Sequence, residues 1–213
     1  MKKTVGRVVR ILLVCSLLLF VSYRIYLSRG SRRAISGLTE PVQTEAEGSV
    51  KTRVNGYDVT ITYLYEYEMD GLVVHTKRYN GPGVADKLAP VDVAVCWGDV
   101  ARYNRQINFH WTQSNRFCNW YVSDVNDLDY IGGEEGMITQ CSNNHLIPAS
   151  SKLEKQIKRI HPGDHILIKG YLVNVDAEKP DGQTFWWYSS TTREDSGDGA
   201  CEVIYVTSVE KLD

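Results

Sequence analysis

The stretch CSNNHLIPASSKLEKQIKRIHPGDHILIKGYLVNV, residues 141–175, contains the strongest local signals in this chain and decides its fold. Ser151 and Glu154 fit a capping box, in which the serine hydroxyl accepts from the Glu154 amide and the carboxylate reaches back to the cap. Apolar residues at helical spacing follow, namely Leu153, Ile157 and Ile160, and Pro162-Gly163 cannot continue a helix. We therefore expect one short helix beginning at residue 151.

A strand is expected directly after this helix, over residues 164–175. Ile166, Ile168 and Leu172 alternate with residues that would point to the other face of a sheet. Gly170 interrupts the alternation, which predicts a bulge or the close approach of another backbone. Before the helix, residues 141–149 are polar and are expected to form a loop.

The amino-terminal part of the globular region has the pattern of a β-meander. Asn55-Gly56 and Asp70-Gly71 are both signals for a type I′ hairpin turn. Apolar and polar residues alternate between them, which predicts a half-buried antiparallel strand carrying Tyr63, Tyr65 and Tyr67 on one face. Such a row of tyrosines could stack on a ligand, but core packing or a cross-strand ladder is the commoner arrangement.

The remaining segments are short strands separated by turns and loops. Strands are expected at 91–97, 107–112, 117–122, 184–188 and 201–208, with a loop at 80–90, a long loop at 123–140 and a further loop at 190–200. The fold class is therefore mainly β (α+β). An antiparallel OB-like barrel or curved sheet with one short helix is the expected architecture, by analogy with other folds of this composition.

Residues 1–33 differ from the rest of the chain in charge and hydropathy. They hold eight Lys and Arg residues and no acidic residue, around an uncharged run of 13 residues, ILLVCSLLLFVSY. A cleaved signal peptide is the rival interpretation, but no convincing small-x-small cleavage site follows the run. We expect an N-terminal transmembrane anchor at 1–33, a tether at 34–48 and a β-rich domain at 49–213, because flanking apolar residues extend the run toward a spanning length.

Charge also bears on location and partners. Residues 34–213 keep 16 basic residues against 26 acidic ones, a formal charge of −10, which argues against nucleic acid as a partner. The basic start before an apolar core favours an amino terminus in the cytoplasm, although the positive residues on the two sides of the core are nearly balanced. The expected location is the bacterial inner membrane, single-pass, with the domain facing the periplasm or cell exterior.

Four cysteines lie in the predicted domain, namely Cys96, Cys118, Cys141 and Cys201. This even number is compatible with two disulfide bonds in an oxidising compartment, with three possible pairings. A catalytic alternative is a hydrolase in which Cys141 or Cys201 is the nucleophile, His145 the base, and Asp198 or Asn144 the residue that orients it. No cysteine-hydrolase signature surrounds either thiol, so disulfide formation is the preferred interpretation.

Metal and cofactor chemistry have weaker support in the sequence. Cys141, His145, His161 and His165 are suitable ligand types, but their spacing matches no zinc pattern. The acidic segment 194–199 lacks the ligand order of a helix-loop-helix calcium site. We therefore assign no metal and no cofactor.

A binding surface is expected where the polar loops at 141–149 and 190–200 meet. Its predicted members are the polar residues that flank two of the cysteines: Asn143, Asn144, His145, Arg193, Asp195 and Asp198. The alternative for residues 142–145 is structural, because Ser and Asn side chains stabilise turns and His145 could pin the loop to the sheet.

Four segments, YEYEMDGLVV (65–74), SNNHLIPA (142–149), GDHILIKGYLV (163–173) and SGDGACEVIYV (196–206), resemble an uncharacterised family of bacterial single-pass membrane-anchored proteins. The resemblance covers most of residues 57–208 and implies an anchored location but no reaction. The motif positions that it singles out are Asn143, Asn144, His145, Gly170, Asp198, Gly199 and Cys201. The expected function is a membrane-tethered extracytoplasmic binding or assembly module, with the membrane and another envelope protein as expected partners. The alternative is the cysteine/histidine-dependent hydrolase.

Overall fold

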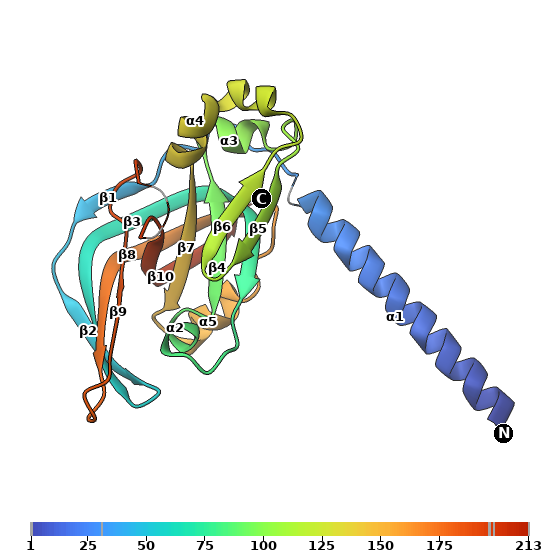
Figure 1. Ribbon diagram of the computed structural model, residues 1–213, viewed down its shortest axis with the longest axis horizontal. Coiled ribbons are helices and arrows are strands. Elements are labelled where there is room, and N and C mark those ends of the chain that lie inside the picture. The colour runs from blue at the N-terminus through green and yellow to red at the C-terminus, as the bar shows by residue number, and fades with distance from the viewer. Residues whose placement is uncertain (1, 31, 196, 198, 213) are drawn as a thin grey trace.

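A computed structural model describes the chain except residues 1, 31, 196, 198 and 213, and it leaves the side chains of residues 2–8, 24 and 26–30 undescribed. A long helix and a β-rich head make up the molecule (Figure 1). The elements run in the order α1 (Lys2–Gly30), β1 (Val42–Glu45), β2 (Ser49–Val54), β3 (Tyr57–Arg78), α2 (Val84–Leu88), β4 (Val91–Cys96), α3 (Gly98–Tyr103), β5 (His110–Ser114), β6 (Phe117–Tyr121), the 3-10 helix η1 (Val125–Ile131), α4 (Gly133–Thr139), β7 (Cys141–Pro148), α5 (Ser151–Ile157), β8 (His165–Glu178), β9 (Thr184–Tyr188) and β10 (Glu202–Leu212).

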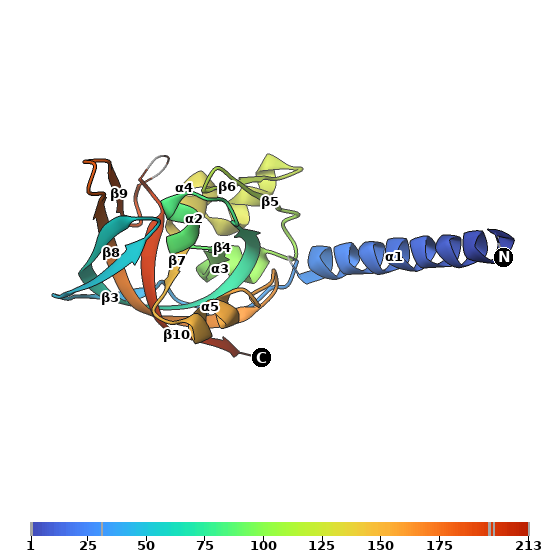
Figure 2. The same cartoon turned by 90° about the horizontal axis from the view of Figure 1, so that it is seen from below.

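One large mixed sheet dominates the described part of the chain, which confirms the mainly β prediction. Its strand order is β1-β3-β4-β7-β10-β8-β9, with β2 also paired to β3. β3 pairs with β8 as well, so the strands β3, β4, β7, β10 and β8 each have a partner on both sides. β7 and β10 are parallel and the other pairs are antiparallel, so the predicted purely antiparallel sheet is wrong at this one pair. Figure 2 shows how strongly β3 and β8 curve.

β3 is a single strand of 22 residues, and the hairpin predicted at Asp70-Gly71 does not exist. The first part of β3 pairs with β8 and its last part pairs with β4, so the chain bends without turning back. A Cβ atom on Gly71 would lie 2.2 Å from Cγ1 of Val95, so this glycine permits close packing of two strands. The turn predicted at Asn55-Gly56 is confirmed, since both residues have positive φ between β2 and β3.

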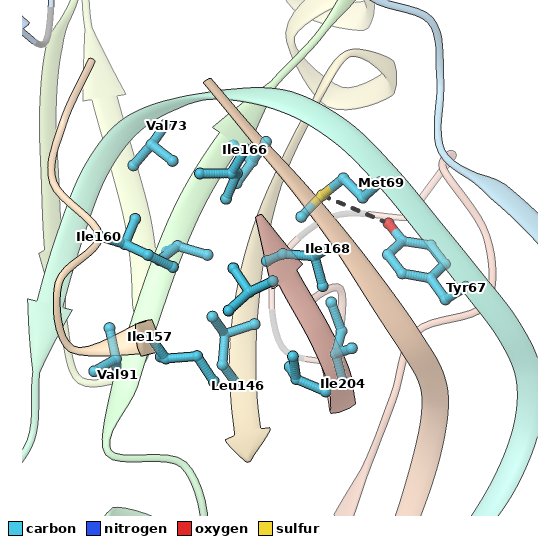
Figure 3. Packing of buried hydrophobic residues seen from close by; sticks show 14 of the residues in the cluster. Tyr67, Met69, Val73, Val91, Leu146, Ile157, Ile160, Ile166, Ile168 and Ile204 are labelled. Atoms are coloured by element: carbon cyan, nitrogen blue, oxygen red, sulfur yellow. Dashed lines mark hydrogen bonds between the residues drawn. The ribbon is translucent and has the colours of Figure 1, made fainter. Parts of the chain in front are cut away.

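The main apolar cluster lies between β3, β4, β7, β8 and β10, and α5 closes one end of it. Figure 3 shows its members, among them Met69, Leu146, Ile157, Ile168 and Ile204, all of which are fully buried. The predicted helix is confirmed at Ser151–Ile157, but its cap is Ser150, whose hydroxyl accepts from the Leu153 amide at 3.3 Å. Gly170 fits the predicted close approach, because a Cβ there would lie 2.1 Å from the carbonyl oxygen of Tyr205.

The loops predicted at 123–140 and 141–149 are both wrong. The first folds into η1 and α4, whose apolar residues join a second cluster with α3 and the β5–β6 hairpin. The second is strand β7, which is paired with β4 on one side and β10 on the other. Its polar sequence suits a central strand only because neighbouring elements supply hydrogen-bond partners for the side chains, which the sequence pattern does not show.

The helix α1 projects away from the head and the predicted tether lies against the head (Figure 1). Ile35 N–H donates to Ala101 O at 3.0 Å, Leu38 is buried and β1 pairs with β3. Among the side chains that the structure describes, no helix has both the length and the apolar run that crossing a bilayer requires. The transmembrane anchor predicted over 1–33 is therefore not supported, and part of that stretch lies outside the described side chains.

Candidate functional site

A buried pair of polar residues lies where β4 and β7 run side by side. Asp92 and His145 are register partners on these strands, so their side chains share one face of the sheet. His145 Nδ1 lies 2.9 Å from Asp92 Oδ1, close but not aligned as a hydrogen bond, and the His145 ring packs on Trp187 with 4.5 Å between centroids. Asp92 is completely buried, so its charge requires a cationic partner.

Arg116 supplies that partner from the turn of the β5–β6 hairpin. Asn115 and Arg116 both have positive φ, as a type I′ turn requires, and the turn places the guanidinium over the sheet. Nη1 donates to Asp92 Oδ1 at 2.7 Å and Nη2 donates to Asp86 Oδ1 at 2.6 Å. The guanidinium also stacks on the Tyr79 ring at 3.6 Å, so one cation joins α2, β4 and the hairpin.

A chain of amide groups runs from Arg116 to His75, and its direction follows from one backbone carbonyl. Asn143 Nδ2 donates to Arg116 O at 2.6 Å, which leaves Asn143 Oδ1 to accept from Gln113 Nε2 at 2.5 Å. Gln113 Oε1 therefore accepts from His75 Nδ1 at 2.9 Å. A carbonyl can only accept, so this order fixes both amide orientations and puts the His75 proton on Nδ1. Burial lowers the pKa of His75, which keeps the ring neutral.

The predicted meeting of the 141–149 and 190–200 segments is found at Asn143 and Cys201. Asn143 Nδ2 lies 3.4 Å from Cys201 Sγ, because β7 and β10 are adjacent parallel strands. Asn143, Asn144 and His145 are buried, however, so they do not form an open surface. The structural interpretation of the SNNH segment fits these contacts. Asp198 lies outside the described residues.

A second buried ion pair holds the 190–200 segment against the sheet. Arg193 Nη1 contacts Glu202 Oε1, and Arg193 Nη2 donates to the Tyr67 hydroxyl at 3.0 Å. Burial raises the pKa of Glu202 to about 7, and the nearby Arg193 charge opposes this rise without cancelling it. Asp195 has a hydrogen-bond partner within the same segment. It accepts from the Ser190 hydroxyl at 2.6 Å, which orders the start of the segment.

The predicted disulfide bonds are absent, since every cysteine that the structure describes is a free thiol. Cys96, Cys118 and Cys141 instead pack in the apolar cluster that also holds α3 and the hairpin. Burial raises the pKa of Cys96 and Cys141 well above the usual value, and raises the pKa of Cys118 and Cys201 to about 12. The sulfur atoms are therefore protonated at neutral pH.

This arrangement does not favour the chemistry predicted for a thiol hydrolase. A nucleophilic cysteine needs a base within hydrogen-bond reach and a lowered pKa. The His145 ring packs on Trp187 beside the Asp92 carboxylate, and the polar contacts of Cys201 are with Asn143 and the carbonyl of Arg116. His, Cys, Asp and Glu side chains within the described ranges form no group suited to a metal ion.

Several residues of these networks are absent from the sequence-based prediction. Asp92 stands alone in the apolar strand VDVAVC, and Glu202 precedes the apolar run VIYV, so each is a carboxylate in a segment that will be buried. That isolation is a usable signal, because a buried carboxylate needs a partner. Nothing local in the sequence identifies Arg116 as the partner of Asp92. Comparison of the chain with family models, curated proteins and solved structures finds no match.

Proposed function

We propose that this chain is a membrane-tethered binding or assembly module, with α1 as the attachment and an extracytoplasmic head on the bacterial inner membrane. The observation that carries the proposal is the contrast between the two parts of the molecule. The head buries its own apolar residues in three clusters. The described apolar side chains of α1 stay exposed, for example Leu13 at 65% and Leu19 at 72%.

An exposed apolar helix requires an apolar environment. Burying a leucine side chain is worth about 1.5–3 kcal/mol, and α1 carries a succession of such residues from Ile11 to Val21. Basic residues flank this run, and they are suited to anionic lipid headgroups. Attachment of α1 to a membrane gives its apolar run a lipid environment and gives its basic residues anionic headgroups. This agrees with the resemblance to membrane-anchored proteins.

We also propose that the head is an OB-like barrel. The five strands that pair on both sides are, in chain order, β3, β4, β7, β8 and β10, and α5 lies between the third and the fourth. OB-folds are five-stranded barrels that bind ligands on the face of their second and third strands. Here those strands are β4 and β7, and Arg116 of the hairpin already occupies that face. A ligand must therefore bind elsewhere on the head unless the hairpin moves.

Tethering is tested by fractionating cells that express the full-length chain and a variant lacking residues 2–30. The full-length chain is expected in the membrane fraction and to resist extraction at high salt, and a reporter at the carboxyl terminus is expected to be active outside the cytoplasm. A cytoplasmic reporter signal overturns the topology, and equal solubility of the two forms overturns the tether.

The hydrolase alternative is tested by thiol labelling of the native chain. The four cysteines of the head are expected to react slowly until denaturant is added. Rapid labelling of Cys201 in the folded chain would restore the thiol nucleophile as a candidate.

A further inference from the structure

A cavity of about 640 Å³ lies where the head meets the carboxyl-terminal part of α1. Its walls come from the last part of β3, from the β5–β6 hairpin, from His161-Pro162 before β8, and from Tyr23 and Arg32. These segments are far apart in sequence, so the cavity is a product of the tertiary fold. Its volume lies in the range of small-molecule sites.

The charge of this cavity is opposite to that of the head. Arg32, Lys77 and Arg78 line it and no Asp or Glu does, although residues 34–213 carry a formal charge of −10. Within the described part of the chain, none of these three cations forms an ion pair. Arg78 donates to the Lys158 carbonyl, which orients its guanidinium without neutralising it. An uncompensated group of cations in a concave wall attracts anions.

Three histidines complete the polar lining, namely His75, His110 and His161. The described side chains include no set of ligands that could hold a metal ion, and His75 and His110 already contact the amide side chains of Gln113 and Asn108. His75 is fixed by its bond to Gln113, and His110 is fixed by stacking on Tyr121 with 4.3 Å between centroids. Two of the three rings are therefore held in place before any ligand arrives, which lowers the entropy cost of binding.

We propose that this cavity binds a phosphate group carried by an organic molecule, a phosphoester. Lys and Arg together are suited to a tetrahedral oxyanion, the lysine as a point charge and the guanidinium as a fork of donors. The volume exceeds what one inorganic phosphate fills, and the rings of Trp111 and Tyr121 offer apolar contact to the organic part. The phosphoester is a soluble metabolite or a phospholipid headgroup, and the headgroup source rests on the proposed function because it requires α1 at a membrane.

The test uses the purified full-length chain, Lys77→Glu and the matched control Lys51→Glu. Lys51 is an exposed strand lysine that does not line this cavity, so both variants make the same charge change. Binding of glycerol 3-phosphate is measured by calorimetry. Binding to phosphatidylcholine vesicles with and without phosphatidylglycerol is measured by co-sedimentation. Lys77→Glu is expected to weaken binding about tenfold, because it replaces a cation in the cavity wall by an anion that repels the phosphate, and Lys51→Glu less than about twofold.

The two binding measurements distinguish a soluble phosphoester from a lipid headgroup. They also distinguish a failure of the phosphoester site from a failure of the proposed membrane attachment. Loss of glycerol 3-phosphate binding in Lys77→Glu supports a soluble phosphoester, even if the chain proves not to be membrane-attached. A loss confined to the phosphatidylglycerol vesicles supports a lipid headgroup. Absence of binding to both probes, or equal weakening by both substitutions, overturns the site. Arg78→Gln repeats the test without charge reversal, and urea midpoints establish that each variant is folded.

Discussion

The guanidinium of Arg116 lies 2.7 Å from the carboxylate of Asp92, 24 residues away in the sequence, and Asp92 has no exposure to solvent. This contact fastens the β5–β6 hairpin onto the face formed by β4 and β7 (Figure 1). It converts the face that an OB-like barrel would offer to a ligand into an internal surface. Removal of the Arg116 side chain should therefore destabilise the head.

Arg116→Met is expected to destabilise the head by about 3–5 kcal/mol, because it leaves the buried Asp92 charge without its cationic partner. Urea denaturation measures the change. The matched control is Arg102→Met, since Arg102 and Asp99 form an exposed pair on the surface of α3 and the change should cost less than about 1 kcal/mol. The double substitution Asp92→Asn, Arg116→Met should recover part of the loss. Equal effects of the Arg116 and Arg102 substitutions would show that the buried pair contributes no more to stability than an exposed pair does.

Glu202 predicts a pH dependence of stability with a definite sign. Its pKa is raised by burial to about 7 in the folded chain, against 4.5 for the ordinary carboxyl, so the folded state binds the proton more tightly. The stabilisation is complete below about pH 4.5 and is lost as the pH rises through 7. Over this window the wild-type chain should lose about 3 kcal/mol relative to Glu202→Gln.

The measurement for Glu202 is a series of urea denaturation curves between pH 4.5 and 8 for both chains. Glu210→Gln is the matched control, because Glu210 lies exposed on the same strand. Its stability curve should run parallel to that of the wild type. A Glu202→Gln curve that also runs parallel would contradict the raised pKa.

Asn143→Asp tests the direction of the amide chain from Arg116 to His75. The substitution replaces the Nδ2 donor by an oxygen that faces the Arg116 carbonyl, and it adds a carboxyl group at a buried position. A loss of about 1–3 kcal/mol is expected from the unsatisfied carbonyl alone. Asn119→Asp, at an exposed position on β6, should be nearly neutral. Nitrogen NMR should also show the proton of neutral His75 on Nδ1 in the wild-type chain, and a proton on Nε2 would refute the assigned direction.

The N-terminal cap of α5 predicts different effects for substitutions at two adjacent serines, Ser150 and Ser151. Ser150→Ala should cost about 1 kcal/mol, because the Ser150 hydroxyl accepts from the Leu153 amide, whereas Ser151→Ala should change stability little at the first helical position. Thermal unfolding of the two variants gives the comparison directly. The reverse order would restore the cap that the sequence pattern predicted.

Signals contained in a few neighbouring residues were reliable guides to this fold. The helix at 151–157, the turn at Asn55-Gly56 and the strand at 184–188 all follow from such signals and are confirmed. Gly170 likewise predicted the close approach of a second backbone. These features depend on backbone dihedrals, caps and side-chain alternation, which a segment of about ten residues contains in full.

Where local signals misled, the deciding contact came from a distant segment. Gly71 resembles a turn residue, but it lies inside β3 because Val95 of β4 packs against it. The polar run 141–149 resembles a loop, but it is the central strand β7 because Gln113, Arg116 and Val93 provide partners for its amides. The four cysteines of the head suggest disulfide bonds by their even number, but the structure describes each of them as a free thiol.

The sequence by itself therefore determined the mainly β class, the position of the short helix α5 and the separation of a basic, apolar leader from an acidic head. Only the tertiary structure decided which carboxylates are buried, which cations lie beside Asp92 and Glu202, and that Arg32, Lys77 and Arg78 line an open cavity. The physical reason is the distance along the chain over which each interaction acts. Dihedral preferences act between neighbours in the chain, whereas the cost of a buried charge is set by whichever distant side chain the fold brings to it.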